Sequence, residues 1–273
     1  MIIEQPAATP IRLQARFFRA KRFIADIMCH PLVGRVISAI FRNRIPSSGC
    51  VINTNSEAIA PSLKAALFWG IYESAEVRFV KEYLRGDLDV IELGSSLGVV
   101  SCQILRKLRP GGRLVCVEAN PHLLGILSKN LKQMSNGHEV SVVHGAVANP
   151  SNGLSVQIVL GADSTASRVV EDKGFQGSVP VPALTLSDIL RDNRITGRFS
   201  LVSDIEGAEV CFVENDAVAL RRCEQVLIEL HETSWAGQTV SVDRLRLRLE
   251  EAHGFVMRAN HGPVCLFERG PSH

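Results

Sequence analysis

Residues 89–99 read Asp-Val-Ile-Glu-Leu-Gly-Ser-Ser-Leu-Gly-Val, and this stretch indicates the fold. A short apolar run, a glycine turn and a helical segment are typical of the first strand and helix of a doubly wound α/β sheet. Gly94 lets the chain turn close to a bound ligand, and Gly98 lets the following helix pack near the strand. The pattern therefore predicts a nucleotide-type site at the carboxyl end of this strand.

Outward from this turn, short apolar runs alternate with helical stretches, which predicts βαβ units and a mostly parallel sheet. The expected strands are 88–93, 113–118, 140–144, 199–204, 224–230 and 263–268, and the expected helices are 98–108, 121–134, 185–193, 209–221 and 240–252. Residues 146–182 interrupt this rhythm and predict a β-hairpin insertion with a loop over the site.

The N-terminal part differs in character from the rest of the chain. Residues 11–45 carry eight Lys/Arg against a single acid, with apolar residues at helical spacing. This predicts a basic amphipathic helix, or two helices broken near Pro31. Such a helix either covers the main domain or contacts an anionic membrane surface or a partner. Residues 46–62 are interpreted as a connector, so we divide the chain into an extension at 1–62 and a main domain at 63–273.

Composition sets limits on the class of protein. The chain has 273 residues and a formal net charge of +2, so bulk charge gives no sign of a nucleic-acid partner. No run of roughly 20 apolar residues suggests a membrane span. The seven cysteines include no Cys-x-x-Cys pair, which favours reduced thiols in a cytoplasm over a disulfide framework or a zinc knuckle.

Two acids at strand ends indicate the ligand. Glu118 lies 24 residues after Gly94, where a carboxylate can accept hydrogen bonds from both ribose hydroxyls of an adenosine. A dinucleotide enzyme usually shows Gly-x-Gly-x-x-Gly, whereas this loop reads Gly-Ser-Ser-Leu-Gly. Glu92 would repel a pyrophosphate but suits an amino group and a sulfonium cation, as in S-adenosyl-L-methionine. The alternatives are a helix-capping acid at Glu92 and a solvated strand end at Glu118.

Several blocks in order resemble the FkbM family of methyltransferases, over about residues 65–270. They are Leu67-Phe-Trp-Gly-Ile-Tyr-Glu73, Val117-Glu-Ala-Asn-Pro121, Val142-Val-His-Gly-Ala146, Asp204-Ile-Glu-Gly-Ala-Glu209 and Ile228-Glu-Leu-His231. The resemblance implies a Rossmann-like class I methyltransferase fold with a mostly parallel seven-stranded sheet and helices on both faces. It also implies methylation of a hydroxyl on a sugar, glycan or polyketide-like small molecule, with S-adenosyl-L-methionine as cofactor.

The resemblance and the strand-end acids together give a set of expected cofactor contacts. These are Tyr72, Glu73, Glu92, Gly94, Ser95, Gly98, Glu118, Ala119, Ala146 and Asp204. The chain departs from the family where Ser203 occupies a position that is frequently Lys. This difference indicates another positioning group or another substrate.

The chemistry is expected at the ends of neighbouring strands. Methyl transfer to an alcohol needs close positioning and a base for the hydroxyl proton. We expect His231 to be the general base, Asp204 to orient cofactor or acceptor, and Glu206 to bind a substrate hydroxyl. Asp204, Glu206, Glu229 and His231 could alternatively ligate a divalent metal, although none is expected. Glu209 is expected in the first turn of the next helix.

Two other functions compete with the methyltransferase. A nicotinamide-dependent oxidoreductase is disfavoured by the absent third glycine and by Glu92. A binding or scaffold protein that keeps the fold would use the basic N-terminal helix as its main surface. The fold alone permits all three functions, so the site has to decide.

Overall fold

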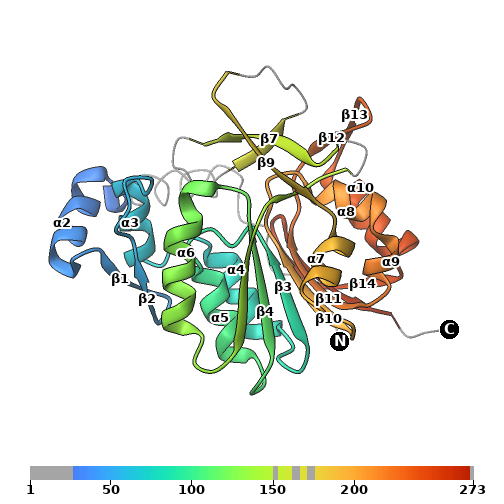
Figure 1. Ribbon diagram of the computed structural model, residues 1–273, viewed down its shortest axis with the longest axis horizontal. Coiled ribbons are helices and arrows are strands. Elements are labelled where there is room, and N and C mark those ends of the chain that lie inside the picture. The colour runs from blue at the N-terminus through green and yellow to red at the C-terminus, as the bar shows by residue number, and fades with distance from the viewer. Residues whose placement is uncertain (1–26, 150–152, 162–166, 171–175, 271–273) are drawn as a thin grey trace, which may run out of the picture.

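A seven-stranded sheet forms the centre of the protein (Figure 1). The computed structural model describes residues 27–149, 153–161, 167–170 and 176–270. The strand order is β14-β15-β11-β10-β3-β4-β5. Their bounds are β3 Asp89–Leu93, β4 Arg113–Glu118, β5 Glu139–His144, β10 Phe199–Ser203, β11 Cys223–Glu229, β14 Phe255–His261 and β15 Val264–Arg269. Only β15 runs antiparallel to its neighbours in this sheet, so the predicted mostly parallel sheet is confirmed.

Helices cover both faces of the sheet because successive strand residues point to opposite sides. Val90 faces the core shared with α4 (Ser74–Tyr83), α5 (Val99–Lys107) and α6 (Pro121–Met134). Its neighbour Ile91 faces the opposite core. That core holds α7 (Leu186–Asp192), α8 (Glu209–Asn215), α9 (Ala217–Leu220), α10 (Val242–Leu247) and the π-helical turn η2 (Arg248–Ala252).

One predicted helix is divided in two. The expected helix at 209–221 breaks at Asp216, between α8 and α9. The Asp216 carboxylate accepts hydrogen bonds from the backbone N–H groups of Leu186 and Ser187, at 3.0 and 3.1 Å. Asp216 therefore supplies a cap for the first turn of α7, a tertiary role that helical periodicity does not reveal.

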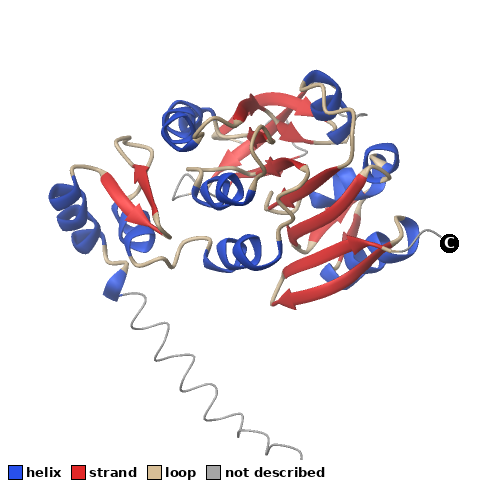
Figure 2. Ribbon diagram, turned by 90° about the horizontal axis from the view of Figure 1, so that it is seen from below, coloured by secondary structure: helices blue, strands red, loops and turns tan. Residues whose placement is uncertain are grey.

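The N-terminal elements pack beside α5 and α6 (Figure 2). They are α2 (Pro31–Phe41), β1 (Arg44–Ser47), β2 (Cys50–Asn53) and α3 (Pro61–Phe68). Of the two alternatives, the one with two helices broken near Pro31 is confirmed, since helical residues end at 28 and α2 begins at Pro31, whereas residues 11–26 lie outside the described residues.

The interpretation of residues 46–62 as a connector is wrong for the β1–β2 hairpin. Ile45 and Ile52 are fully buried in the core that also holds α5 and α6. Asn130 of α6 accepts from the N–H of Asn53 at 2.8 Å and donates to its carbonyl at 3.2 Å. The hairpin thus extends the core, and the domain boundary at residue 62 stays a prediction.

A disulfide joins Cys50 of β2 to Cys102 of α5, with a Cα–Cα distance of 6.7 Å. The prediction that the cysteines are all reduced is therefore wrong for this pair. The two cysteines are 52 residues apart in the sequence and meet only because the hairpin packs on α5. The disulfide also removes the argument from cysteine usage for a reducing compartment.

A second, smaller sheet lies above the carboxyl ends of the central strands (Figure 1). It contains β6 (Ala146–Val147), β7 (Ser155–Leu160), β8 (Ser167–Val170) and β9 (Ser178–Leu184). The predicted β-hairpin insertion is confirmed, since β7 pairs antiparallel with both β8 and β9. A short hairpin, β12 (Thr233–Trp235) and β13 (Gln238–Val240), follows β11. Within the described residues, no helix is long and apolar enough to cross a membrane.

Candidate active site

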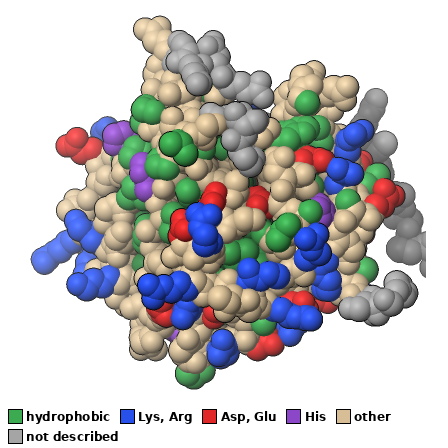
Figure 3. Space-filling view, turned by 45° about the vertical axis from the view of Figure 1, so that its right-hand side comes forward, with side chains coloured by type: hydrophobic (Ala, Val, Ile, Leu, Met, Phe, Trp, Pro, Cys, Tyr) green, Lys and Arg blue, Asp and Glu red, His purple; other side chains and the backbone are tan. Residues whose placement is uncertain are grey.

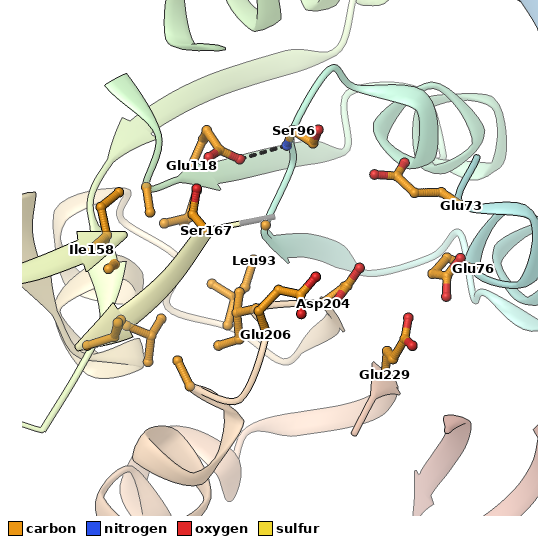
Figure 4. Close-up of a pocket in the computed structure, with 18 of the residues that line it drawn as sticks. Glu73, Glu76, Leu93, Ser96, Glu118, Ile158, Ser167, Asp204, Glu206 and Glu229 are labelled. Carbon is orange, nitrogen blue, oxygen red and sulfur yellow. Dashed lines mark hydrogen bonds between the residues drawn. The ribbon is translucent and has the colours of Figure 1, made fainter. Parts of the chain in front are cut away.

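A cavity of about 330 Å³ lies at the carboxyl ends of β3, β4 and β10. The small sheet closes it from above through Ile158 and Val169, and Figure 4 shows acidic side chains around it. Eight of the predicted catalytic and cofactor-binding residues line this cavity: Tyr72, Glu73, Gly94, Glu118, Ala119, Ala146, Asp204 and Glu206. The structure therefore brings together groups from five separate segments of the chain.

Glu118 defines one end of the cavity. Its side chain is buried at the end of β4. One of its oxygens accepts a hydrogen bond from the backbone N–H of Ser96 at 2.7 Å (Figure 4), and the other accepts one from the N–H of Asn120 at 2.7 Å. A carboxylate has about four lone-pair sites, so each oxygen can still accept a hydroxyl. Burial raises the pKa of Glu118, and the backbone hydrogen bonds oppose that rise. This geometry suits a ligand with two adjacent hydroxyl groups.

Gly94 makes the turn at the end of β3. Its φ of +83° lies in the left-handed region, and a Cβ placed there would be 1.9 Å from the backbone oxygen of Asp204. Only glycine avoids both the strained φ and this clash. The turn therefore packs directly on the chain that follows β10.

Tyr72 and Glu73 approach from the segment before α4. The Tyr72 hydroxyl and the Ser96 hydroxyl are 2.8 Å apart and share a hydrogen bond. Glu73 has a φ of +50°, an uncommon conformation for a residue other than glycine. Burial raises the pKa of both Tyr72 and Glu73 well above their usual values. This segment thus fixes one wall of the cavity against the glycine turn.

Three predicted cofactor residues do not line this cavity: Glu92, Ser95 and Gly98. The side chain of Glu92 lies on the α5 side of β3. Its carboxylate accepts hydrogen bonds there from the Ser101 hydroxyl at 2.5 Å and from the Cys116 thiol at 3.3 Å. Burial raises the pKa of Glu92 to about 7 despite these bonds. The structure thus gives the electrostatic argument for Glu92 no support. Gly98, with φ +84°, starts α5 and packs close to Leu127.

Acidic side chains crowd the other end of the cavity. Asp204 and Glu206 follow β10, and Glu229 ends β11 (Figure 4). Glu206 has a φ of +54°, which is backbone strain of the kind found at functional sites. Burial raises the pKa of Asp204 to about 7, against the opposing charge of His231. Burial and a hydrogen bond with Glu76 raise the pKa of Glu229 to about 8.

His231 lies beside this acidic end but is not among the residues that line the cavity. Its Nδ1 is 3.1 Å from Oε1 of Glu209, whose side chain is fully buried. Burial lowers the pKa of His231, but the hydrogen bond and the charge of Glu209, with those of Asp204 and Glu206, outweigh burial and raise it to about 9. An imidazole that carries its proton at neutral pH cannot accept another, so this arrangement does not favour His231 as general base.

The same groups could hold a cation. One donor atom each from Asp204, Glu209 and His231 lies within 4.8 Å of the other two. Two of these residues belong to the metal-ligand alternative predicted from the sequence. Glu209 does begin α8 as predicted, but its carboxylate also accepts from the N–H of Ile205 at 3.2 Å.

Sequence reasoning missed three contributors to the site. Glu76 of α4 and Ser167 of β8 line the cavity, yet neither stands in a strand-end motif. Glu209 was placed on its helix without its contact to His231. The available signal was its position as the last acid of the Asp-x-Glu-Gly-x-Glu block, five residues after Asp204.

Fold and site together define an S-adenosylmethionine-dependent methyltransferase with a Rossmann-like class I fold. The family model described as the methyltransferase FkbM domain matches residues 93–257, which is more than half of the chain. The chain therefore belongs to the FkbM methyltransferase family. The resemblance found in the sequence is confirmed, and so are the class and its cofactor, S-adenosyl-L-methionine.

Two solved structures with a similar fold are both distant from this chain in sequence. The chain is 18% identical to precorrin-6y C5,15-methyltransferase from Geobacter metallireducens, with 72% of this chain and 88% of the other covered and a TM-score of 0.39. For TYW2 from M. jannaschii in complex with AdoMet, the identity is 12%, the coverage 82% and 84%, and the TM-score 0.40. Similarity at this level says nothing about the substrate of this chain. No curated protein matches its sequence.

Proposed function

We propose that this protein transfers the methyl group of S-adenosylmethionine to a hydroxyl oxygen of a sugar, glycan or polyketide-like small molecule. One observation carries the proposal: a single cavity joins a buried carboxylate suited to ribose, Glu118, to an end lined by the carboxylates of Asp204, Glu206 and Glu229. Carboxylates accept hydrogen bonds from hydroxyl groups, so the acidic end suits a polyhydroxylated acceptor.

The residues present fit the cofactor. Glu118 keeps free lone pairs for the two ribose hydroxyls, and Gly94 leaves the space that a Cβ would fill. Ala119 and Ala146 supply small apolar side chains on the same wall, where an adenine ring would contact them. When bound, S-adenosylmethionine supplies a methyl carbon activated by its sulfonium.

The acidic end would position the acceptor. Asp204 and Glu206 lie on the cavity wall after β10 and can each hydrogen-bond an acceptor hydroxyl. Because the Asp204 carboxylate lies on this wall, it is also our candidate for the group that receives the acceptor proton. Ile158 and Val169 of the small sheet add apolar side chains to the cavity wall, which would reduce the contact of bound reactants with water.

The same charges disfavour a nucleic-acid acceptor. Phosphates would meet Asp204, Glu206 and Glu229 at the mouth of the acceptor end, and like charges repel. On the face shown in Figure 3, Lys and Arg side chains are spread among acids and do not form a continuous basic surface. The proposal therefore keeps a small-molecule or glycan acceptor.

The test is an acceptor screen with the wild-type protein and S-adenosylmethionine carrying a deuterated methyl group. The panel pairs polyols and sugars with their amino counterparts and includes a short RNA. We expect mass spectrometry to find the label as an ether on the hydroxylated compounds. Labelling of only the amines or only the RNA would contradict the proposal.

We also propose that α2 attaches the protein to an anionic membrane surface. Its outward face carries Leu32, Val36 and Ile40, which are 61%, 58% and 68% exposed. Arg35 and Arg42 lie on and beside this stripe, and residues 12–22 contribute five more Lys/Arg. Aliphatic residues flanked by basic ones are typical of helices that lie in a lipid interface.

Co-sedimentation with phosphatidylserine vesicles tests this attachment. Replacing Val36 and Ile40 by Asp should abolish binding, because it places charges in the apolar stripe. The matched control is Val218→Asp, which changes an apolar residue that is 65% exposed on α9. Equal sedimentation of the double variant and wild type would contradict attachment through α2.

A further inference from the structure

Four carboxylates surround the single imidazole of His231. Its Nδ1 lies 3.1 Å from Oε1 of Glu209, while its Nε2 lies 3.7 to 3.9 Å from oxygens of three other acids. Those acids are Asp204, Glu206 and Glu229. Within the described part of the chain, no Lys or Arg side chain lies within ion-pair distance of any of the four. The four acids therefore have the imidazole as their one cationic partner among the described residues, and partly buried carboxylates are seldom ionised together without a further cation.

Two oxygens of this group are shielded from solvent and have no hydrogen-bond partner. They are Oδ1 of Asp204 and Oε2 of Glu209. The Glu209 side chain has 0% exposure, and its other oxygen is held by the N–H of Ile205 and by His231. Leaving a buried acceptor unsatisfied costs about 1–3 kcal/mol, and more when the group is charged. The two unpartnered oxygens are evidence separate from the charges of the group, and they favour a positively charged ligand.

The spacing of the group matches the coordination shell of one ion. Two adjacent ligands placed about 2.2 Å from a common ion at a right angle are about 3.1 Å apart. Oε1 of Glu209 and Nδ1 of His231 share a hydrogen bond of this length, 3.1 Å, so a cation that displaces the shared proton would need little movement of either side chain. Asp204 offers a third donor atom within 4.8 Å of both. An imidazole among carboxylates suits Mn²⁺, Fe²⁺ or Zn²⁺ better than Mg²⁺ or Ca²⁺, which prefer oxygen ligands alone.

We propose that Asp204, Glu209 and His231 bind a divalent transition-metal cation beside the acceptor end of the cavity. Glu206 and Glu229 lie near Nε2, the other ring nitrogen of His231, and line the adjacent part of the cavity. A hydroxyl bound to such a cation loses its proton more readily. That consequence rests on the proposed function, whereas binding of the cation does not.

The experiment is a titration of the chelator-treated, full-length protein with Mn²⁺, followed by the electron paramagnetic resonance signal of free Mn²⁺. A calorimetric titration with Zn²⁺ runs in parallel. We expect one saturable site per chain in the wild type. Asp204→Asn and His231→Gln should each weaken binding at least tenfold. The matched control is Glu214→Gln, which lies on the same helix as Glu209 but pairs with Arg248.

Circular dichroism and melting temperature establish that each variant is folded before its binding is interpreted. Absence of saturable Mn²⁺ and Zn²⁺ binding by the folded wild type, or equal binding by all four proteins, overturns the proposal. Calorimetry with S-adenosylmethionine on the chelator-treated protein keeps the two proposals apart. Loss of cofactor binding there would count against the proposed function and leave the cation site standing on the Mn²⁺ result.

Discussion

At the end of β4, both oxygens of Glu118 accept backbone N–H hydrogen bonds, whereas at the end of β10 Oδ1 of Asp204 has no partner. The first end of the cavity is thus organised before any ligand arrives and needs only hydroxyl donors to complete it. The second end concentrates negative charge that the described chain balances with one histidine. We call the end at Glu118 the donor half, for the methyl donor, and the end at Asp204 the acceptor half, for the methyl acceptor. The comparison indicates that the protein itself organises the donor half, whereas the acceptor half depends on its ligands for its hydrogen bonds and charge balance.

The largest expected effect is on the acceptor half. Asp204→Asn removes the charge that receives the acceptor proton in the proposed function, so we expect kcat for methyl transfer to fall by about 100-fold or more. The Kd for S-adenosylmethionine should stay within about threefold of the wild type, because the ribose contact is intact. Single-turnover kinetics and calorimetry measure the two quantities. A parallel loss of cofactor affinity would place Asp204 in the donor half and remove the distinction drawn above.

For Glu118→Ala we expect the opposite pattern, in which the main effect is on the Kd for the cofactor. Loss of the proposed ribose contact should weaken binding of both S-adenosylmethionine and S-adenosylhomocysteine about tenfold or more, which corresponds to about 1.4 kcal/mol. Calorimetric titration of the purified variant measures it. Glu139→Ala is the control, since Glu139 pairs with Arg113 at the surface. If Glu118→Ala binds both compounds as tightly as the control, the assignment of the cofactor ribose to Glu118 is wrong.

The smallest expected effect concerns Glu92, which lines neither half of the cavity. Its pKa of about 7 exceeds the ordinary 4.5, so between these pH values the folded protein holds a proton that the unfolded chain has released. Stability from this group is therefore full below pH 4.5 and falls as the pH rises toward 7. Glu92→Gln removes the dependence and should raise the free energy of unfolding at pH 8 by about 1 kcal/mol relative to the wild type.

Melting curves at pH 5 and pH 8 check this prediction. The difference in melting temperature between Glu92→Gln and the wild type should grow by about 2–4 °C from the lower to the higher pH. A difference that does not change with pH would show that Glu92 is already ionised in the folded protein. It would then be available to attract a cationic ligand, as the sequence first indicated.

Much of the fold was predictable because its elements are long and regular. The six strands expected between residues 88 and 268 are all present, and α6 spans the expected 121–134. The β1–β2 hairpin was not predicted because each strand is only four residues long and β1 contains Pro46. Its stability comes from the contacts of Ile45 and Ile52 with a core assembled from later parts of the chain.

Site residues were predictable from the sequence where their positions depend on neighbouring residues of the chain. Glu118 is held by residues of the adjacent turns, and strand-end motifs sufficed to place it on the cavity. The face on which Glu92 lies depends on strand register, since a shift of one residue moves a side chain to the opposite side. The pairing of His231 with Glu209 spans 22 residues and two elements, and no local pattern encodes it.

The contact between Gly94 and the backbone of Asp204 has a consequence for redesign of the enzyme. The donor turn and the start of the acceptor end share one backbone junction, also tied by the hydrogen bond from the N–H of Asp204 to the carbonyl of Leu93 at 3.0 Å. New acceptor specificities are therefore best sought by varying the side chains of Glu206, Glu229 and Ser167. A changed or lengthened backbone at residue 204 would transmit its displacement to the turn that receives the methyl donor.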